Sequence, residues 1–501
     1  MARELDRSLH TRARRKRWPL VVAPLALAVA LAGAIAADGV ERGPPRQRDE
    51  VSVSLLAGAA GAPVPKAFLG LSFELSSAAQ IASYGGRGNF VAMLRSLGPG
   101  ILRLGGASAD SRVAWSDSSK PRPAWASSVL EPADLRRLRR LASASGWRVL
   151  LTLGLAHYDA RSAAREAAAA RRILGRSLAG IEIGNEPDSY GHHALRALPW
   201  TAARYEREVS AYRRAIARRT PGLPVAGPGV SGSRAFKVWG AAEARRQHPA
   251  LLTGHHYPLR CDSVPPPTIA DLLSPRIRSL EALSLQRYMS VSRRRRTPFR
   301  MDETNTVSCG GRAGISDTFA SALWATSYIT QAMAAGTAGI NLQGAPANCR
   351  GYSPVCATTP TQLALGALQA QPEWYALLLT RSLIGDRPLR TRIAAPANPN
   401  LVVAALSGAG GVLKFVIVDD EPAGAPAAVR LHVARGLHVA SVLRLTAAGP
   451  EARSGVRLGG RAVARDGSWH AGHLEHLTAH AGVLGLDIAP SSAVLVTASP
   501  H

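Results

Sequence analysis

The sequence is short of several features that mark common protein classes. Only four cysteines occur among 501 residues, and none stands in a Cys-x-x-Cys spacing, which argues against a structural zinc site. No glycine-rich phosphate fingerprint follows the first predicted strand, so an open dinucleotide-binding sheet is disfavoured. No internal repeat is visible, which argues against a solenoid or a propeller.

Acidic residues are also scarce. The chain has 34 Asp and Glu against 61 Lys and Arg, for a formal net charge of +27. A basic surface suits acidic partners, such as an acidic polysaccharide. The arginines, however, are spread over all the predicted helices, a pattern typical of solvated helix faces. We therefore predict no nucleic-acid partner.

The N-terminal segment has the pattern of an export signal. Basic residues between Arg12 and Arg17 precede an apolar run from Pro19 to about Ala37, which closes on Ala34-Ile35-Ala36. This order predicts a secretory signal with cleavage after Ala36. The run is also long enough to remain as a membrane anchor. We expect residues 1–37 to be a signal peptide or anchor, a secreted or extracytoplasmic protein, and membrane contact only through this segment.

The four cysteines are Cys261, Cys309, Cys349 and Cys356. An even count in an exported protein favours disulfides, and three connectivities exist. We favour Cys261 with Cys309, which would join two loops after consecutive strands. The other pair, Cys349 with Cys356, would close one short loop.

Strand and helix patterns alternate about eight times over roughly 300 residues, as in a (β/α)8 TIM barrel. The predicted strands are 67–73, 101–104, 148–153, 180–184, 225–227, 251–256, 298–302 and 338–343. The clearest predicted helices are 201–219, 234–246, 276–292 and 318–335. The fold class is therefore α/β.

The pattern changes after Gly385 to short Val, Leu and Ala strands separated by Gly, Pro and Asn. Such a pattern predicts a small antiparallel β-sandwich. A lone alternating strand at 51–56 is expected to join it. The predicted domains are a linker at 38–50, an N-terminal sandwich strand at 51–66, the barrel at 67–385 and the sandwich at 386–501.

Two glutamates follow barrel strands. Glu186 comes after the fourth strand and Glu303 after the seventh. Active sites of such barrels lie at the carboxyl ends of the strands, and these two positions face each other across the ring. Retaining glycoside hydrolysis needs two facing carboxyl groups, one as nucleophile and one as acid and then base. We expect Glu186 to hold the proton and Asn185 to bind a sugar hydroxyl.

Four motifs then carry a family resemblance: Ile183 to Tyr190, Leu102 to Gly106, His255-His256-Tyr257 and Gly314 to Ala320. Together they resemble heparanase and the microbial β-glucuronidases of glycoside hydrolase family 79, which belongs to the clan A barrel glycosidases. The resemblance extends from about Ala67 to Tyr375, and the trailing β-domain is also similar. It implies retaining cleavage of a β-linked glucuronide, with Glu186 as acid/base, Glu303 as nucleophile, and neither metal nor organic cofactor.

Other residues at this rim are candidates for binding substrate. Tyr257 matches a family tyrosine near the nucleophile, although a packed loop tyrosine would read the same. Glu74 suits sugar hydroxyls, or an ion pair with Arg103. Asp110 is expected to reach the substrate or to cap the next helix. Tyr352 is placed to bind the sugar carboxylate.

Two observations limit the resemblance. His255 and His256 lack a third ligand at metal-binding spacing, so no metal site is predicted. Microbial relatives often carry tyrosine in the loop after the nucleophile, whereas this loop reads Thr306-Val307-Ser308-Cys309. That departure bears on sugar recognition rather than on the mechanism.

The sequence thus predicts a secreted retaining β-glycosidase that acts on a carbohydrate substrate, most specifically a β-glucuronidase. One alternative is an endo-acting, heparanase-like enzyme on acidic polysaccharides. The other is a non-catalytic carbohydrate-binding barrel protein. The sequence carries no signal for the oligomeric state.

Overall fold

The computed structural model describes residues 50–58, 60–117, 121–396, 399–433 and 436–500. The predicted signal or anchor at 1–37 and nearly all of the predicted linker lie outside these residues. Within the described part of the chain, no helix combines the length and the apolar composition needed to cross a membrane.

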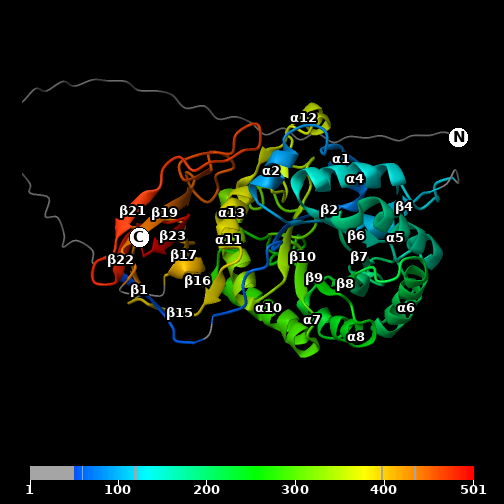
Figure 1. Ribbon diagram of the computed structural model, residues 1–501, viewed down its shortest axis with the longest axis horizontal. Helices are drawn as coiled ribbons and strands as arrows, with labels where there is room; N and C mark the ends of the chain where they lie inside the picture. The colour runs from blue at the N-terminus through cyan, green and yellow to red at the C-terminus, as the bar shows by residue number, and fades with distance from the viewer. Residues whose placement is uncertain (1–49, 59, 118–120, 397–398, 434–435, 501) are drawn as a thin grey trace, which may run out of the picture. The chain divides into compact units, whose positions relative to one another are not determined.

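Eight parallel strands close into a barrel, which confirms the predicted fold class (Figure 1). Each strand pairs with the next in chain order, and β11 pairs with β2 to complete the ring. The strands are β2 (Leu69–Glu74), β3 (Ile101–Gly105), β6 (Arg148–Leu153), β7 (Leu178–Ile183), β8 (Val225–Val230), β9 (Leu251–His256), β10 (Phe299–Thr304) and β11 (Gly339–Gly344). They are buried almost throughout, as expected of barrel strands covered by helices.

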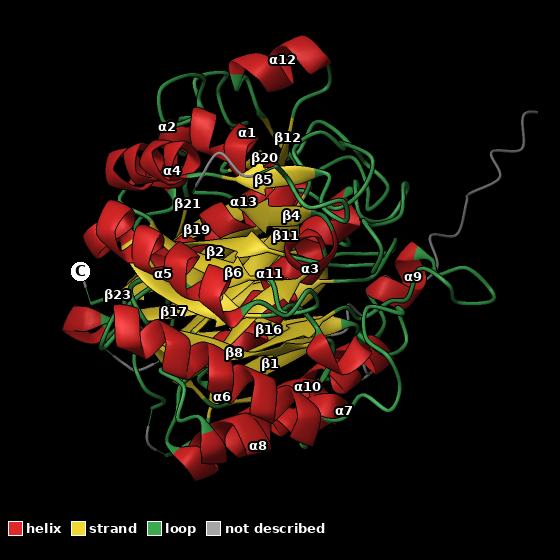
Figure 2. Ribbon diagram, turned by 90° about the vertical axis from the view of Figure 1, so that its right-hand side faces the viewer, coloured by secondary structure: helices red, strands yellow, loops and turns green. Residues whose placement is uncertain are grey.

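Helices cover the outside of the barrel (Figure 2). The main ones are α1 (Ala78–Ser83), α2 (Phe90–Ser96), α4 (Pro132–Ser145), α5 (Ala160–Leu174), α6 (Ala202–Arg219), α8 (Trp239–Arg246), α10 (Pro275–Arg295), α11 (Phe319–Ala335) and α13 (Pro372–Thr380). Short elements in the loops are α3 (Ser108–Ser111), β4 (Val113–Trp115), β5 (Ser128–Leu130), α7 (Ser233–Phe236), α9 (Ile269–Leu272), β12 (Val355–Cys356), α12 (Pro360–Leu365) and β13 (Gln369–Ala370).

A second, all-β unit follows the barrel and contains two sheets. One sheet has the order β15-β1-β18-β22, and the other has the order β14-β16-β17-β23-β19-β20, with β21 paired to β19. The strands are β1 (Glu50–Leu55), β14 (Arg387–Leu389), β15 (Thr391–Ala394), β16 (Leu401–Ser407), β17 (Leu413–Asp419), β18 (Ala427–His432), β19 (Val439–Thr446), β20 (Arg457–Leu458), β21 (Glu475–Thr478), β22 (Val483–Ile488) and β23 (Ser492–Ser499).

The N-terminal strand joins this unit, as predicted. β1 pairs antiparallel with β15 and parallel with β18, which is the one parallel pairing among the described strands of the two sheets. Alternate residues such as Val53, Phe415 and Val429 are buried in a core of their own between the sheets. The outer face of the larger sheet packs on α11 and α13, so apolar residues there continue the barrel core.

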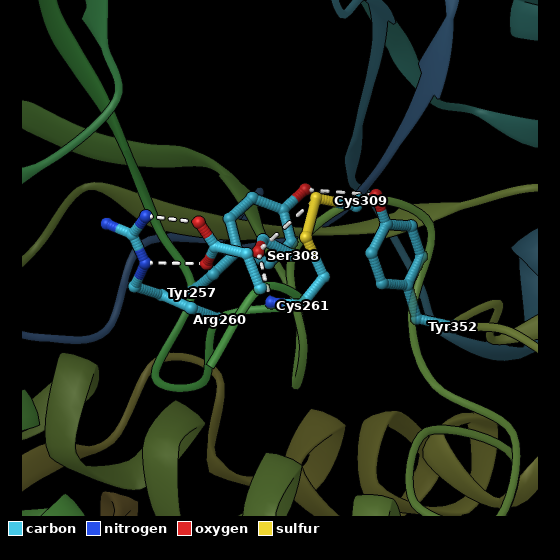
Figure 3. The surroundings of a disulfide bond; sticks show 7 residues. Tyr257, Arg260, Cys261, Ser308, Cys309 and Tyr352 are labelled. Carbon is cyan, nitrogen blue, oxygen red and sulfur yellow. Dashed lines mark hydrogen bonds and ion pairs between the residues drawn. A yellow bond between two sulfur atoms is a disulfide. The ribbon is translucent and has the colours of Figure 1, made fainter. Parts of the chain in front are cut away.

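Both favoured disulfides are present. Cys261 and Cys309 join the loops after β9 and β10, with their Cα atoms 6.0 Å apart (Figure 3). Cys349 and Cys356 close the short loop after β11, with a Cα separation of 5.3 Å. The first bridge ties together the two loops that follow β9 and β10.

Four fully buried glutamates lie outside the barrel centre and carry unusually weak acidity. Burial raises the pKa of Glu166, Glu243, Glu281 and Glu373 to about 8 in each case. In the pH range between the ordinary value of 4.5 and this raised value, the folded protein therefore keeps protons that the unfolded chain releases. By linkage, each of these groups makes the folded state less stable as the pH rises through that range.

We therefore predict that the melting temperature falls when the pH is raised from 6.5 to 8.0. Glu373→Gln keeps a neutral side chain on Asn305, which donates to Glu373 Oε2 at 3.0 Å, and should reduce the fall. The exposed Glu451→Gln should leave it unchanged. Scanning calorimetry of the three proteins at both pH values measures this. A melting temperature that rises over this range would contradict the prediction.

Candidate active site

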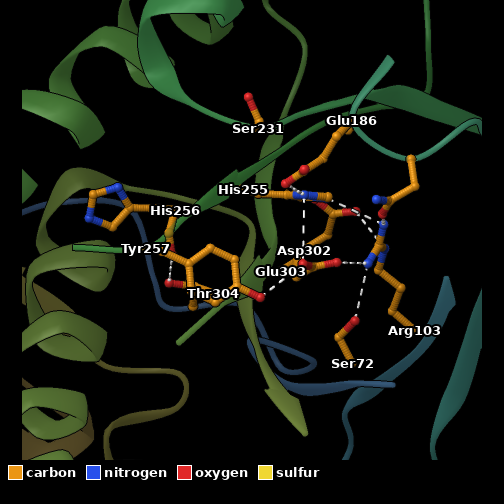
Figure 4. Close-up of polar contacts among 12 residues, drawn as sticks. Ser72, Arg103, Glu186, Ser231, His255, His256, Tyr257, Asp302, Glu303 and Thr304 are labelled. Carbon is orange, nitrogen blue, oxygen red and sulfur yellow. Dashed lines mark hydrogen bonds and ion pairs between the residues drawn. The ribbon is translucent and has the colours of Figure 1, made fainter. Parts of the chain in front are cut away.

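A single buried arginine organises the carboxyl end of the barrel (Figure 4). Arg103, on β3, has no exposed side-chain surface. Its Nη1 donates to Glu303 Oε2 at 2.7 Å and to Ser72 Oγ at 3.1 Å. Its Nη2 donates to Glu182 Oε2 and to Asn185 Oδ1, both at 2.8 Å. One planar group thus links side chains from four strands or strand ends.

One further acid, Asp302, completes the surroundings of this guanidinium. Arg103 Nε lies 2.9 Å from Asp302 Oδ2. Burial raises the pKa of Glu182, but the charge of Arg103 and hydrogen bonds outweigh it and bring the pKa to about 2. Burial and the charge of Glu182 raise the pKa of Asp302 well above its ordinary value. Of these two acids, Glu182 is therefore the one that loses its proton more readily.

The end of β10 is irregular, and this irregularity matters for Glu303. The pairing register of β10 shifts after Met301 against both neighbouring strands. In a regular strand, consecutive side chains point to opposite faces, whereas a bulge re-aims one of them. Here Asp302 and Glu303 follow one another and both reach Arg103.

Glu303 is held as a carboxylate. Its Oε1 accepts a hydrogen bond from Tyr257 at 2.9 Å, and its side chain is only 9% exposed. Burial raises the pKa of Glu303, but the charges of His255 and Arg103 and the Tyr257 hydrogen bond outweigh burial. The net result is a pKa below the ordinary value. An ionised, oriented carboxylate is what a nucleophile requires.

Glu186 is positioned by its backbone. It has left-handed dihedrals of φ 48° and ψ 52°, uncommon for a residue with a side chain. Its N–H donates to Gly229 O at 2.8 Å. Trp200 Nε1 donates to Pro187 O at 2.7 Å, and Asp188 accepts from Ser231 N at 3.0 Å. These contacts hold the turn on both sides of Glu186.

His255 lies between the two glutamates. Its Nδ1 is 2.8 Å from Glu186 Oε1 and 3.9 Å from Glu303 Oε1. Burial lowers the pKa of His255, but the charge of Glu303 and the hydrogen bond with Glu186 raise it to about 9. The imidazole is therefore cationic at neutral pH. Two positive groups, Arg103 and His255, balance the two carboxylates Glu182 and Glu303.

The two predicted catalytic carboxyls lie close together. Glu186, His255 and Glu303 each offer an oxygen or nitrogen atom within 4.8 Å of the others. Among the described residues, these three are also the group of side chains that could hold a metal ion. Hydrogen bonds to Tyr257, Arg103 and His255 already occupy the same atoms, and the set fits acid–base chemistry better than a metal site.

Asn185 and Asp110 are both at this rim. Asn185 accepts from Arg103, and its backbone N–H donates to Asp110 Oδ2 at 2.7 Å. Asp110 also accepts from Tyr190 Oη at 2.7 Å and from the backbone N–H groups of Leu155 and Ala156. The Asp110 carboxylate therefore braces the rim and does not cap α3.

The other candidates surround the glutamates. Glu74 Oε2 accepts from Ser108 N at 2.8 Å, and burial raises the pKa of Glu74. The rings of Tyr257 and Tyr352 stack with centroids 5.7 Å apart, and their hydroxyls are 3.4 Å apart. Burial also raises the pKa of Tyr352, so its hydroxyl stays protonated.

Sequence reasoning gave Arg103 and His255 too little weight, and missed Glu182 and Asp302. All four are charged or titratable residues within apolar barrel strands, at positions where a side chain points inward. A charged group in such a strand needs a partner, which is the signal that was available.

Comparisons with known proteins bear on the fold. No family profile matches the sequence, and no curated protein matches it. Solved structures do match. A 4-O-α-L-rhamnosyl-β-D-glucuronidase from Fusarium oxysporum 12S has a TM-score of 0.70 and 18% identity, covering 89% of this chain and 100% of that chain. The chain has the fold of the barrel glycosidases.

Two other solved structures support this assignment of the fold. The GH51 arabinofuranosidase from Xanthomonas axonopodis pv. citri has a TM-score of 0.64 at 13% identity, over 90% of this chain and 100% of that chain. A GH30 endoxylanase from Clostridium papyrosolvens C71 has a TM-score of 0.54 at 13% identity, with the same coverage. The fold implied by the resemblance to clan A glycosidases is thereby confirmed.

Replacing Arg103 tests its structural role directly. Arg103→Met leaves Glu182 buried without its cation, so we expect the free energy of unfolding to fall by about 3–5 kcal/mol. Arg103→Lys should recover only part of this loss, because an ammonium lacks the planar fork of donors. The exposed Arg140→Met should change stability by less than about 0.5 kcal/mol. Urea unfolding measures all three, and equal stability of the Arg103 and Arg140 variants would refute the role.

Proposed function

We propose that this protein is a retaining β-glycosidase that hydrolyses β-linked glucuronides, with Glu303 as nucleophile and Glu186 as acid and then base. The observation that carries the proposal is the pair itself: two carboxyl groups with oxygens within 4.8 Å, one held ionised. Retaining enzymes have carboxyls about 5–5.5 Å apart, whereas inverting enzymes need about 6.5–9.5 Å to fit a water.

The first step uses both glutamates. Glu303 attacks the anomeric carbon while the bond from that carbon to the glycosidic oxygen breaks, and Glu186 gives its proton to the departing oxygen. Arg103 and Tyr257 orient the Glu303 carboxylate for this attack through hydrogen bonds of 2.7 and 2.9 Å. Asn185, fixed by Arg103, is placed for the sugar hydroxyl next to the anomeric carbon, a contact that strengthens in the transition state.

The second step reverses the roles. Glu186, now a carboxylate, takes a proton from water, and the water oxygen attacks the anomeric carbon and releases Glu303. In the covalent intermediate Glu303 is an ester without charge, so the charge that raised the pKa of His255 is gone. His255 Nδ1 then faces the new carboxylate of Glu186, whose Oε1 lies 2.8 Å away. The proton balance around Glu186 is thus coupled to the state of Glu303.

The choice of glucuronide rests on three supports. The sequence motifs resemble family 79, and a glucuronidase is among the solved structures with this fold. The Tyr352 hydroxyl is buried beside Tyr257 and protonated, and it suits a sugar carboxylate. Two disulfides also suit an exported enzyme that meets such glycans outside the cytoplasm.

Both glutamates can be tested with 4-nitrophenyl β-glucuronide. Glu303→Ala should lower kcat/KM by about 10²-fold or more. Glu186→Ala should instead lower kcat by about 10²-fold or more, because 4-nitrophenolate leaves without an acid whereas attack by water still needs the base. Azide should restore turnover of both variants, giving the β-glycosyl azide with Glu186→Ala and the α-glycosyl azide with Glu303→Ala. The exposed Glu451→Ala is the control.

The outcomes distinguish an error in the proposed mechanism from an error in the proposed sugar. Unchanged activity in either glutamate variant would refute the assignment of that residue. A wild-type protein that cleaves aryl arabinofuranosides or xylosides, but not the glucuronide, would keep the mechanism and discard the sugar. Proton NMR of the first-formed product should show retention of the β-anomer.

A further inference from the structure

A cavity opens beside the catalytic residues on the same rim of the barrel. Its volume is about 140 Å³, close to that of a cavity that holds one six-membered ring. Its walls come from α3 and β4, the loop before β5, the loop after β6 and the start of α5. The side chains that matter here are Asp110, Trp115, Trp125, His157, Asp159 and Glu166.

One carboxylate separates this cavity from the catalytic site. Asp110 lines the cavity, and its Oδ2 accepts from the backbone N–H of Asn185. Gly154, which ends the third barrel strand, lines it too. The cavity and Asn185 are therefore connected through the two sides of one carboxylate.

Two polar groups of the cavity have no partner among the residues that the structure describes. Glu166 is 6% exposed and makes no hydrogen bond or ion pair with the described residues. The buried Trp115 Nε1 also lacks a hydrogen-bond partner among them. Burial raises the pKa of Glu166 to about 8, so at neutral pH its carboxyl both donates and accepts. Such groups are costly unless a ligand or water satisfies them.

The rest of the lining is aromatic or small. Trp125 and His157 stack with ring centroids 3.9 Å apart and planes 12° from parallel. Ala109, Ala114 and Ala163 leave the interior open. Aromatic surface combined with a few unsatisfied polar groups fits a sugar ring, which has both apolar C–H faces and hydroxyls that donate and accept.

The charge of the cavity lining indicates which kind of sugar it can bind. No Lys or Arg is among the described residues that line the cavity, in a chain whose net charge is +27. The nearby Arg165 faces Asp117 at 3.2 Å. Asp110 and Asp159 are both engaged with backbone N–H groups and remain acidic neighbours. An anionic unit such as a uronate or a sulfated sugar is disfavoured here.

We propose that this cavity is a subsite for a neutral sugar ring that is linked to the glucuronate unit cleaved at Glu186 and Glu303. The assignment rests on the proposed function and extends it, since it makes the natural substrate at least a disaccharide with one charged and one neutral ring. In the subsite, hydroxyls of the neutral ring satisfy Glu166 and Trp115, and Trp125 contacts its C–H face.

Kinetics test the subsite with two kinds of substrate. One is 4-nitrophenyl β-glucuronide, and the others carry a neutral hexose either on O4 of the glucuronate or as the leaving group. Trp125→Ala and Glu166→Ala should lower kcat/KM by about tenfold or more for at least one extended substrate, and by less than about twofold for the aryl glucuronide. Tyr158→Ala, an exposed aromatic of the same loop outside the lining, should affect neither.

Binding gives a readout that does not need turnover. In ¹⁵N-labelled Glu303→Gln protein, the indole N–H resonance of Trp115, assigned by its loss in Trp115→Phe, should shift with an extended glucuronide and not with the aryl glucuronide. A shift in a protein whose wild type fails to hydrolyse glucuronides would refute the proposed function and keep the subsite. Equal kinetic losses on both kinds of substrate, with no shift, would overturn the subsite.

Discussion

The hydrogen bonds of one buried guanidinium determine the geometry of the whole site. Arg103 donates to Glu303, to Asn185, to Glu182 and to Ser72, so residues from β2, β3, β7 and β10 are held by one planar group. Desolvating a cation is costly, and only a complete set of partners offsets that cost. The interaction that satisfies the barrel interior therefore also places Glu303 directly, and places Asn185 next to Glu186.

Charge balance gives each acid of the site a different state. Arg103 and His255 lower the pKa of Glu182 and of Glu303, whereas burial and the charge of Glu182 raise the pKa of Asp302. When their surroundings separate the pKa values of similar carboxyl groups, one site can supply both a nucleophile and a proton donor. His255 contacts Glu186 and senses the charge of Glu303, so it couples the two halves of the proposed reaction.

Much of this could be predicted from the sequence because strand ends are local. The positions of Glu186 and Glu303 follow from counting strands, and the sandwich strand at 51–56 follows from its alternating pattern. The partners of Arg103 could not be predicted, since alternation shows which way a side chain points but not what it meets. The side chains of Asp302 and Glu303 both reach Arg103 because the register of β10 shifts, and the sequence pattern does not indicate this shift. The cavity at Glu166 joins residues as far apart in the chain as Ala109 and Tyr212, and a glutamate in an alanine-rich helix does not indicate a cavity.

The proposed double displacement requires a covalent intermediate on Glu303, and trapping this intermediate tests it. Incubation with a 2-deoxy-2-fluoro-β-glucuronosyl fluoride should inactivate the enzyme slowly, and mass spectrometry of its peptides should place a single fluoroglucuronosyl group on Glu303. The electron-withdrawing fluorine slows the second step more than the attack, so the ester accumulates. A label on a different residue, or steady turnover of this reagent with release of the α-anomer and no label, would contradict the account.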